Sequence, residues 1–234
     1  PLKRKPFTEW EETTTMKTSH SFLFILLLLL AGCKSEERKA QERFEARKML
    51  SDIGIEFTID EYHDRIQEGD YTAVELFLKA GMTPNAGQRA GYYAVDYGHI
   101  TILELLFKYG LDANDSGLVL NAIWEKNIEI LELLKRRGAD FNRNHEIVNF
   151  RGDVQRHLPI TYALDKNRSF NRYGPRGGQY DSYDRKYYEI AEWLIDNGAR
   201  LSGWQRGDTP LREIYLTDDL EEESPTLYRK LRFN

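Results

Sequence analysis

Residues 73–81 read AVELFLKAG, residues 102–110 read ILELLFKYG, and residues 130–138 read ILELLKRRG. Apolar residues recur in these segments at positions i, i+3 and i+4, a spacing that predicts one buried helix face. The closing glycines, Gly81, Gly110 and Gly138, are separated by 29 and then 28 residues. A glycine suits the left-handed residue that ends a helix. The period indicates stacked units, because one unit cannot bury its stripe alone.

Other motifs recur in register with these glycines. They are Gly98-His99, Gly138-Ala139-Asp140-Phe141-Asn142, Leu158-Pro159-Ile160-Thr161, Gly207-Asp208-Thr209-Pro210-Leu211, and an Asn four residues after each glycine, at Asn85, Asn114 and Asn142. They resemble the ankyrin repeat, which opens with a Thr-Pro-Leu-His-like tetrapeptide, has Gly-His between its helices and ends in Gly-Ala-Asp-x-Asn. The resemblance covers residues 57–216. It implies an all-α solenoid of stacked helix-turn-helix units with short hairpin fingers.

The sequence departs from this family pattern in the lengths of its connections. The period is shorter than the usual 33 residues or so, and the deficit before Arg89 and before Gly117 predicts short first and second fingers. The fourth repeat is swollen instead. Its helices are predicted at 158–164 and 190–199, with one insertion lengthening the finger over 143–157 and another between the helices over 168–184. Repeat five opens at Gly207, and residues 217–234 are interpreted as a C-terminal cap whose last helix begins at Ser224-Pro225.

Residues 16–33 have the pattern of an export signal. Lys17 is a short positive region, and residues 22–30 form an apolar stretch too short to span a bilayer. Leu30-Ala31-Gly32-Cys33 resembles the bacterial lipobox, which implies cleavage before Cys33 and acylation of its thiol. We therefore interpret residues 16–32 as a lipoprotein signal peptide and predict a lipid anchor on the periplasmic side of a bacterial membrane. Lys34, in place of the Asp that retains lipoproteins at the inner membrane, favours the outer membrane. A leader cut elsewhere or a short buried helix are the alternatives.

The flanking segments complete the domain organisation. Residues 1–15 are interpreted as untranslated upstream sequence, because Trp10-Glu11-Glu12 back-translates to codons that can contain a ribosome-binding site shortly before Met16. Residues 33–56 are predicted to be a charged tether and an N-terminal capping helix that includes Phe44, Met49 and Leu50. A cytosolic form without the leader, translated from Met49, is an alternative.

The composition of the chain indicates one continuous core and argues against some kinds of partner and cross-link. The chain has 234 residues, of which 41% are hydrophobic, enough for one continuous core. The formal charge of −5 and the lack of a basic stripe in the sequence argue against nucleic acid as a partner. Cys33 is the single cysteine, so an internal disulfide is excluded.

The sequence shows no catalytic constellation. His63 and His99 fall at structural positions of the repeat, and His145 and His157 flank a loop without metal-ligand spacing. Gly174-Pro175-Arg176-Gly177-Gly178 lacks the Lys-Ser/Thr of a phosphate-binding loop. We therefore expect no enzyme activity, cofactor or metal. The acidic run 218–223 is interpreted as a solvated face.

Two surfaces are predicted to bind a partner protein. The first is the insertion in repeat four, because Tyr and Arg often dominate protein interfaces; disorder or family drift is the alternative. Its candidate residues are Arg168, Phe170, Arg172, Tyr173, Arg176, Tyr180 and Tyr183. The second is the concave groove, which the ankyrin resemblance places at Gln67/Glu68, Asp96/Tyr97, Trp124/Glu125 and Asp165/Lys166.

Tyr97, Trp124 and Glu125 are the groove residues that we predict to contact the partner. Packing of Trp124 on the neighbouring repeat is an equal alternative. The acidic groove favours a partner with a basic patch.

The combination of features resembles ankyrin-repeat immunity lipoproteins that neutralise phospholipase toxins delivered between bacteria by type VI secretion. That resemblance implies a cognate lipase toxin, encoded by an adjacent gene, as the partner. A periplasmic scaffold or stress-protection lipoprotein is the main alternative, and an enzyme is a remote one.

Overall fold

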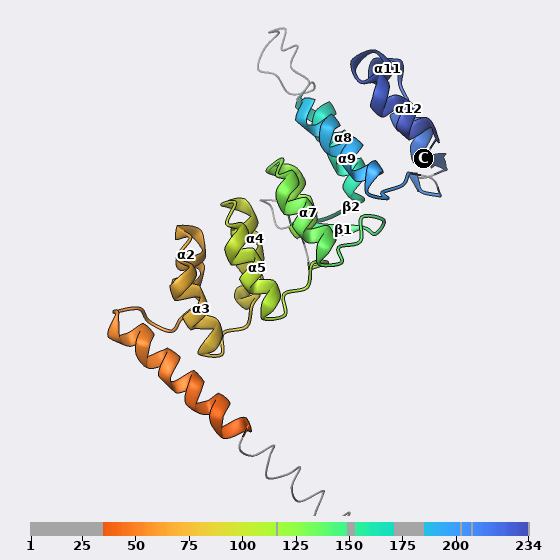
Figure 1. Cartoon of the computed structure of the whole chain (residues 1–234). Coiled ribbons are helices and arrows are strands. Elements are labelled where there is room, and N and C mark those ends of the chain that lie inside the picture. The colour runs from red at the N-terminus through yellow and green to blue at the C-terminus, as the bar shows by residue number, and fades with distance from the viewer. Residues whose placement is uncertain are drawn as a thin grey trace, which may run out of the picture.

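A computed structural model describes residues 35–115, 117–148, 153–170, 185–201, 203–206 and 208–233. Four helix pairs follow one another through most of this length. They are α2 (Ile59–Glu68) with α3 (Tyr71–Lys79), α4 (Ala90–Asp96) with α5 (Ile100–Lys108), α6 (Leu118–Trp124) with α7 (Ile128–Arg136), and α8 (Pro159–Phe170) with α9 (Arg185–Asp196). The first helices of the pairs pack on one another in chain order as an inner row, and the second helices lie beside them as an outer row (Figure 1). The fold is the all-α solenoid of ankyrin type that the repeats predict.

Local signals in the sequence delimit these helices. Thr58, Asp70 and Asn127 accept a backbone N–H with their side chains at the starts of α2, α3 and α7. The predicted stop glycines Gly81 and Gly110 have φ values of 98° and 100°, and those of Gly138 and Gly198 are 90° and 95°. A side chain at such a position is strained, so glycine there ends each outer helix at the same point of the repeat.

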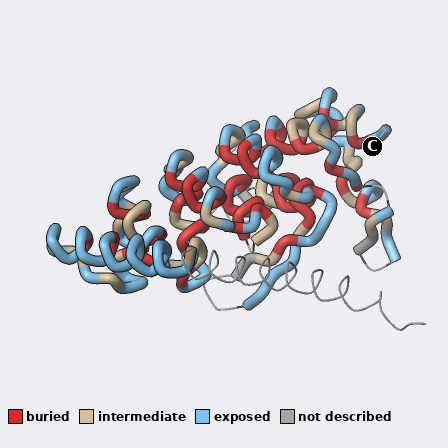
Figure 2. The backbone as a smooth tube through the Cα atoms, turned by 60° about the horizontal axis from the view of Figure 1, so that its bottom comes forward, coloured by how far each residue is buried: buried red, intermediate tan, exposed pale blue. Residues whose placement is uncertain are grey.

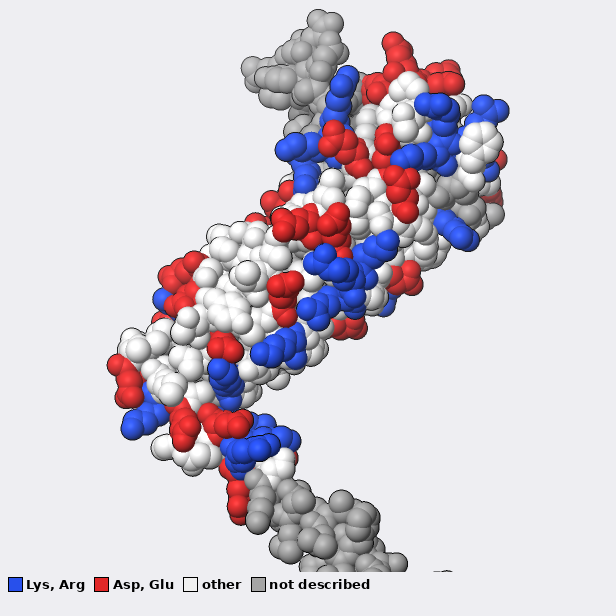
Figure 3. Space-filling view, in the orientation of Figure 1, with Lys and Arg blue, Asp and Glu red and all other residues white. Residues whose placement is uncertain are grey.

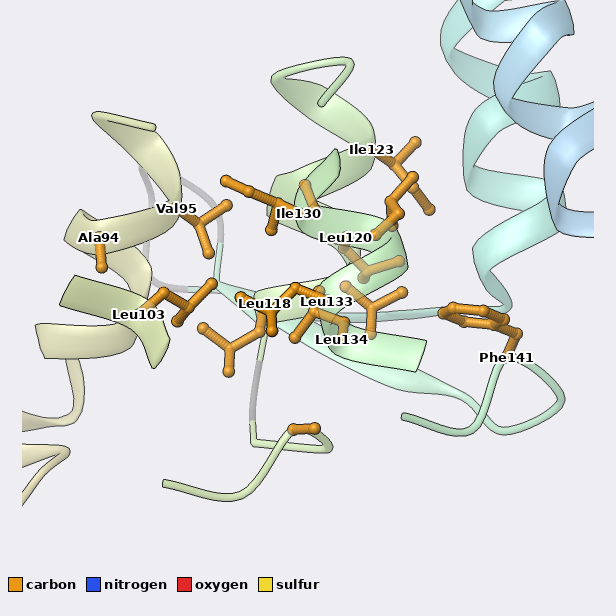
Figure 4. Close-up of a cluster of buried hydrophobic side chains, with 14 of the residues drawn as sticks. Ala94, Val95, Leu103, Leu118, Leu120, Ile123, Ile130, Leu133, Leu134 and Phe141 are labelled. Carbon is orange, nitrogen blue, oxygen red and sulfur yellow. The ribbon is translucent and has the colours of Figure 1, made fainter. Parts of the chain in front are cut away.

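The core runs unbroken from one end of the stack to the other. Figure 2 shows buried backbone along the inward sides of successive helices. In the middle of the stack, Leu103 from α5, Leu120 from α6 and Leu134 from α7 belong to one apolar cluster (Figure 4). Phe141, from the finger that follows α7, also belongs to it. Each repeat is therefore stabilised mainly by its neighbours.

Asparagines join the repeats where the fingers begin. The side chain of Asn114 donates to the carbonyl of Gly138 over 3.1 Å and accepts from the N–H of Asp140 over 2.8 Å. Asn142 makes the same two bonds, both 2.8 Å long, to Gly198 and Arg200. We call these pairs of bonds the asparagine clamps. They explain why an Asn follows Gly110 and Gly138 by four residues; Asn85, the third such Asn, donates to the side chain of Asp115 instead.

Replacing Asn114 with Ala should lower the free energy of unfolding by about 1–2 kcal/mol, because two hydrogen bonds across a repeat boundary are lost. Chemical denaturation measures this change. Asn144→Ala is the matched control, since Asn144 is an exposed asparagine in the following finger. Equal effects of the two substitutions would show that the clamp contributes nothing.

The fingers differ in length as predicted. The first holds only the short 3-10 helix η1 (Ala86–Gln88), and the second is a turn without a strand among its described residues. The third, predicted to be lengthened over 143–157, forms an antiparallel hairpin of β1 (His145–Val148) and β2 (Val154–His157). The fourth is a smaller hairpin of β3 (Gln205–Arg206) and β4 (Thr209–Pro210).

The helices of repeat four are longer than the sequence predicts. The inner helix α8 continues to Phe170, and the outer helix α9 begins at Arg185. Part of the insertion predicted over 168–184 thus extends α8, and the start predicted at 190 for the outer helix is wrong by about a turn. The extension has a physical reason, because Tyr187 and Tyr188 are apolar enough to continue the buried stripe of α9.

Helical segments cover both ends of the stack. Residues 35–52 are helical, and we call them the N-terminal helix; it buries Ala46 and Leu50, whereas Phe44 and Met49 are exposed. At the other end lie α10 (Leu211–Tyr215), α11 (Asp218–Glu223) and α12 (Pro225–Phe233), and α12 packs on α9.

The last helix begins at Pro225, as predicted. The side chain of Ser224 donates to Glu192 instead of capping α12.

Candidate protein-binding surface

The inner helices end along one edge of the solenoid, at the turns that lead into the outer helices. The groove residues predicted in the first three repeats lie there, whereas Asp165 and Lys166 lie about one turn before the end of α8. We call the whole set the inner-helix row. The row consists of Gln67, Glu68, Asp96, Tyr97, Trp124, Glu125, Asp165 and Lys166. Adjacent repeats contact one another through these side chains, so the row is continuous across repeat boundaries.

Tyr97 is an exposed aromatic held in a defined position. Half of its surface, 51%, is accessible to solvent. Its hydroxyl donates to Oε1 of Gln67 in the preceding repeat over 3.1 Å, and its ring stacks on that of His99. His99 is itself fixed, because its Nε2 lies 3.0 Å from the carbonyl of Gln67. Such an ordered aromatic loses little conformational entropy when a partner covers it.

Trp124 is both exposed to a partner and packed on the neighbouring repeat, the two alternatives that the sequence allows. Its side chain is 45% exposed, yet the ammonium of Lys166, from the next repeat, lies 4.0 Å from the centre of its ring. Burial lowers the pKa of Lys166, although the neighbouring Asp165 opposes this shift. The cation therefore covers one side of the indole and leaves the rest accessible to a partner.

The turn after Trp124 has an unusual residue. Lys126 adopts a left-handed conformation with φ of 55°, where the equivalent Gly69 and Gly98 have 77° and 70°. Its ammonium lies 4.9 Å from the ring centre of Tyr187 on α9. This cation–π contact offsets part of the strain of about 1–2 kcal/mol that such a backbone conformation costs.

Two carboxyl groups meet between repeats two and three. Burial raises the pKa of Glu125, and the charge of Asp96 and a hydrogen bond to it raise that pKa further. Lys126 acts in the opposite direction. The repeats thus bring together like charges that a basic partner would neutralise.

A raised pKa makes this carboxyl group a source of pH-dependent stability. The folded protein binds a proton at Glu125 more tightly than the unfolded chain does, so the stabilisation is present at low pH and is lost as pH rises through the folded pKa. Glu125→Gln should therefore become more stable relative to the wild type between about pH 4 and pH 7. Melting temperatures of both proteins across this interval test the prediction. Parallel curves would contradict it, and Glu129→Gln, an exposed residue of α7, is the control.

The charge of the inner-helix row is negative. Glu68, Asp96, Glu125 and Asp165 contribute four carboxylates against the single ammonium of Lys166. Figure 3 shows acidic and uncharged side chains, with a few basic ones between them, along this edge of the first repeats. The predicted groove residues thus carry a net negative charge, and one of them, Glu68, is paired with Arg65 over 2.6 Å.

The structure describes only two of the candidate residues in the insertion. Arg168 and Phe170 belong to the last turn of α8. Arg172, Tyr173, Arg176, Tyr180 and Tyr183 lie outside the described residues, as does Cys33. The end of α8 and the start of α9, between which these residues fall in the sequence, lie side by side.

Three of the histidines have structural partners. Nε2 of His63 lies 2.8 Å from the carbonyl of Ala86, and Nε2 of His145 lies 2.8 Å from that of Asp140. His99 joins two repeats, as described above. Across the described ranges, no group of His, Cys, Asp and Glu residues could hold a metal ion. Nor does that part of the chain contain a helix with the length and apolarity needed to cross a membrane.

One basic feature of the surface is not predicted by the sequence pattern. Successive outer helices end in Lys79, in Lys108, and in Lys135 and Arg136, with Arg137 directly after them. The solenoid places these residues in a band that Figure 3 shows in blue. The expectation that the chain has no basic stripe is therefore wrong for the folded protein. Aligning the repeats and comparing charges column by column would have revealed it.

Comparison with solved structures returns an ankyrin-repeat protein. The chain is similar to the ankyrin repeat domain of human ASB11, with 18% sequence identity, a TM-score of 0.43, and coverage of 84% of this chain and 95% of that one. No family model matches the sequence. No curated protein matches it either. The helix pairs, fingers and asparagine clamps define the class of this protein as an ankyrin-type solenoid.

Proposed function

We propose that this protein is a lipid-anchored, protein-binding solenoid that acts as an immunity protein against a secreted antibacterial toxin of phospholipase type. The observation that carries the binding role is the inner-helix row, where Tyr97 and Trp124 are ordered, roughly half exposed and flanked by carboxylates. Ordered aromatics of this kind are typical anchors of protein interfaces. The acidic surroundings favour a partner with a basic patch.

The anchor is supported by the sequence around Cys33. A short positive region, an apolar stretch and Leu30-Ala31-Gly32-Cys33 follow one another in the order that a lipoprotein leader requires. Several acyl chains on one cysteine give firm anchoring, because each buried CH₂ contributes about 0.8 kcal/mol. An inhibitor held at the membrane on its periplasmic side, with the outer membrane favoured by Lys34, would stand where a lipid-attacking toxin acts.

Replacing Cys33 with Ser should abolish lipid attachment and leave the precursor unprocessed. Metabolic labelling with a fatty acid measures this directly, with the wild-type protein labelled and the variant unlabelled. Ser35→Ala, next to the cleavage region, is the control. Equal labelling of wild type and Cys33→Ser would end the lipoprotein proposal.

The toxin proposal is tested with the product of the adjacent gene. We expect the two proteins to co-purify and the wild-type chain to protect cells that produce the neighbour in the periplasm. Lack of any interaction would overturn the toxin assignment while leaving the anchor unaffected. Co-purification with a neighbouring stress enzyme, without toxicity, would instead support the scaffold alternative.

A further inference from the structure

The basic row consists of Lys79, Lys108, Lys135, Arg136 and Arg137, which lie in or just after the last turns of α3, α5 and α7. All five side chains are exposed. A cation at the end of a helix stabilises the helix dipole, and that explains one basic residue in each of the first three repeats. It does not require three consecutive cations at residues 135–137.

Most of this charge has no carboxylate partner. Lys79 is the exception, with its ammonium 2.9 Å from Glu75. Among the described residues, no carboxylate lies within salt-bridge distance of Lys108, Lys135, Arg136 or Arg137. Lys135 donates to the side-chain oxygen of Asn197, and the guanidinium of Arg137 lies over the ring of Phe107. Asp112 and Asp140, in the fingers that follow, accept backbone N–H bonds.

The N-terminal helix crosses the same edge of the molecule. Nε of Arg47 donates to the carbonyl of Ala80 over 3.2 Å, and the side chain of Arg43 lies against Gly81. Ala80 and Gly81 directly follow Lys79, so this helix meets the basic row at its first member. Residue 35 lies about 12 Å along the helix from Arg43. Cys33 is two residues further, a distance of at most about 7 Å.

We propose that the basic row binds the headgroups of anionic phospholipids in the membrane to which the chain is anchored. This inference rests on the proposed anchor for its geometry, because that anchor tethers the chain beside the row. The solenoid then lies with the ends of its outer helices on the bilayer. The inner-helix row is at the opposite end of each helix pair and faces away from the membrane, where a partner reaches it.

The test uses a chain that starts at Lys34 and therefore has no anchor. It retains the whole described core, which runs from Ala46 to Leu231, and so should fold. We expect it to sediment with phosphatidylcholine vesicles that contain phosphatidylglycerol and to remain in solution with pure phosphatidylcholine vesicles. Salt should release it, since charges at a surface are screened beyond about 8 Å at physiological ionic strength.

Two variants that lose the same amount of charge test whether the basic row is responsible for vesicle binding. Each basic residue near an anionic surface contributes roughly a fivefold gain in partitioning. Changing Lys108, Lys135, Arg136 and Arg137 to Gln should therefore weaken vesicle binding at least about tenfold. The control changes Arg89, Arg185, Arg212 and Arg229 to Gln, an equal loss of charge at exposed positions away from the row.

The control should bind the vesicles nearly as well as the wild type, and all three proteins should melt cooperatively. Equal losses in both variants would overturn the proposal, because net charge alone would then explain binding. Absence of binding by the wild type, or equal binding to both kinds of vesicle, would overturn it as well. Fatty-acid labelling of Cys33 does not depend on vesicle binding. The two experiments therefore distinguish failure of the lipid-binding proposal from failure of the anchor proposal.

Discussion

Replacement of Leu106 by Ala is expected to lower the free energy of unfolding by about 2–5 kcal/mol, the usual range for a buried leucine. Leu106 is fully buried in α5, and its carbonyl accepts the N–H of Leu111 beyond the helix end. The substitution leaves a cavity in a middle repeat. Because every repeat depends on its neighbours, the transition should also become less cooperative.

Denaturation with urea, followed by circular dichroism, measures both effects. Glu104→Ala is the matched control, since Glu104 is exposed on the same helix and its loss should change stability by less than about 0.5 kcal/mol. A midpoint for Leu106→Ala that barely moves would show that the assignment of α5 to the core is wrong.

Loss of the insertion is expected to weaken binding of the proposed partner at least about a hundredfold. The variant replaces residues 171–184 with a short Gly/Ser linker, which keeps α8 and α9 complete. It removes Arg172, Tyr173, Tyr180 and Tyr183, and truncation of a dominant interface residue costs about 2 kcal/mol or more. Two such losses amount to a factor of several hundred, since about 1.4 kcal/mol is tenfold.

Trp124→Ala should add a loss of about thirtyfold if the inner-helix row belongs to the same interface. Titration calorimetry with the purified neighbour measures both variants. Tyr71→Ala is the control for removing an exposed aromatic, because Tyr71 begins an outer helix and is 42% exposed. Full affinity after replacement of 171–184 would remove the insertion from the interface and leave the fingers and inner helices as its only components.

The register of the repeats could be predicted because it depends on single residues with a local role. Gly81, Gly110 and Gly138 end three helices in the same backbone conformation, and glycine is the residue that adopts it without strain. The asparagines could be located for a similar reason. Their function as clamps could not be predicted, because the atoms that Asn114 binds belong to the next repeat.

Most of the features that the sequence does not predict are contacts between repeats. Tyr97 bonds to Gln67 across 30 residues, and the basic row joins side chains that are a full period apart. Such features exist only once the units are stacked. The longer helices of repeat four were missed for a different reason, because Tyr187 and Tyr188 stand beside polar residues that resemble loop sequence.

The asparagine clamps affect which sequence changes this protein can tolerate during evolution. Asn114 and Asn142 bind only a carbonyl and an N–H of the adjoining repeat, atoms that every residue except proline provides. These hydrogen bonds between repeats are thus indifferent to the identity of the side chains beside them. Side chains beside these bonds can therefore change, and a repeat can be as long as the fourth one, while the units still join through the same backbone atoms.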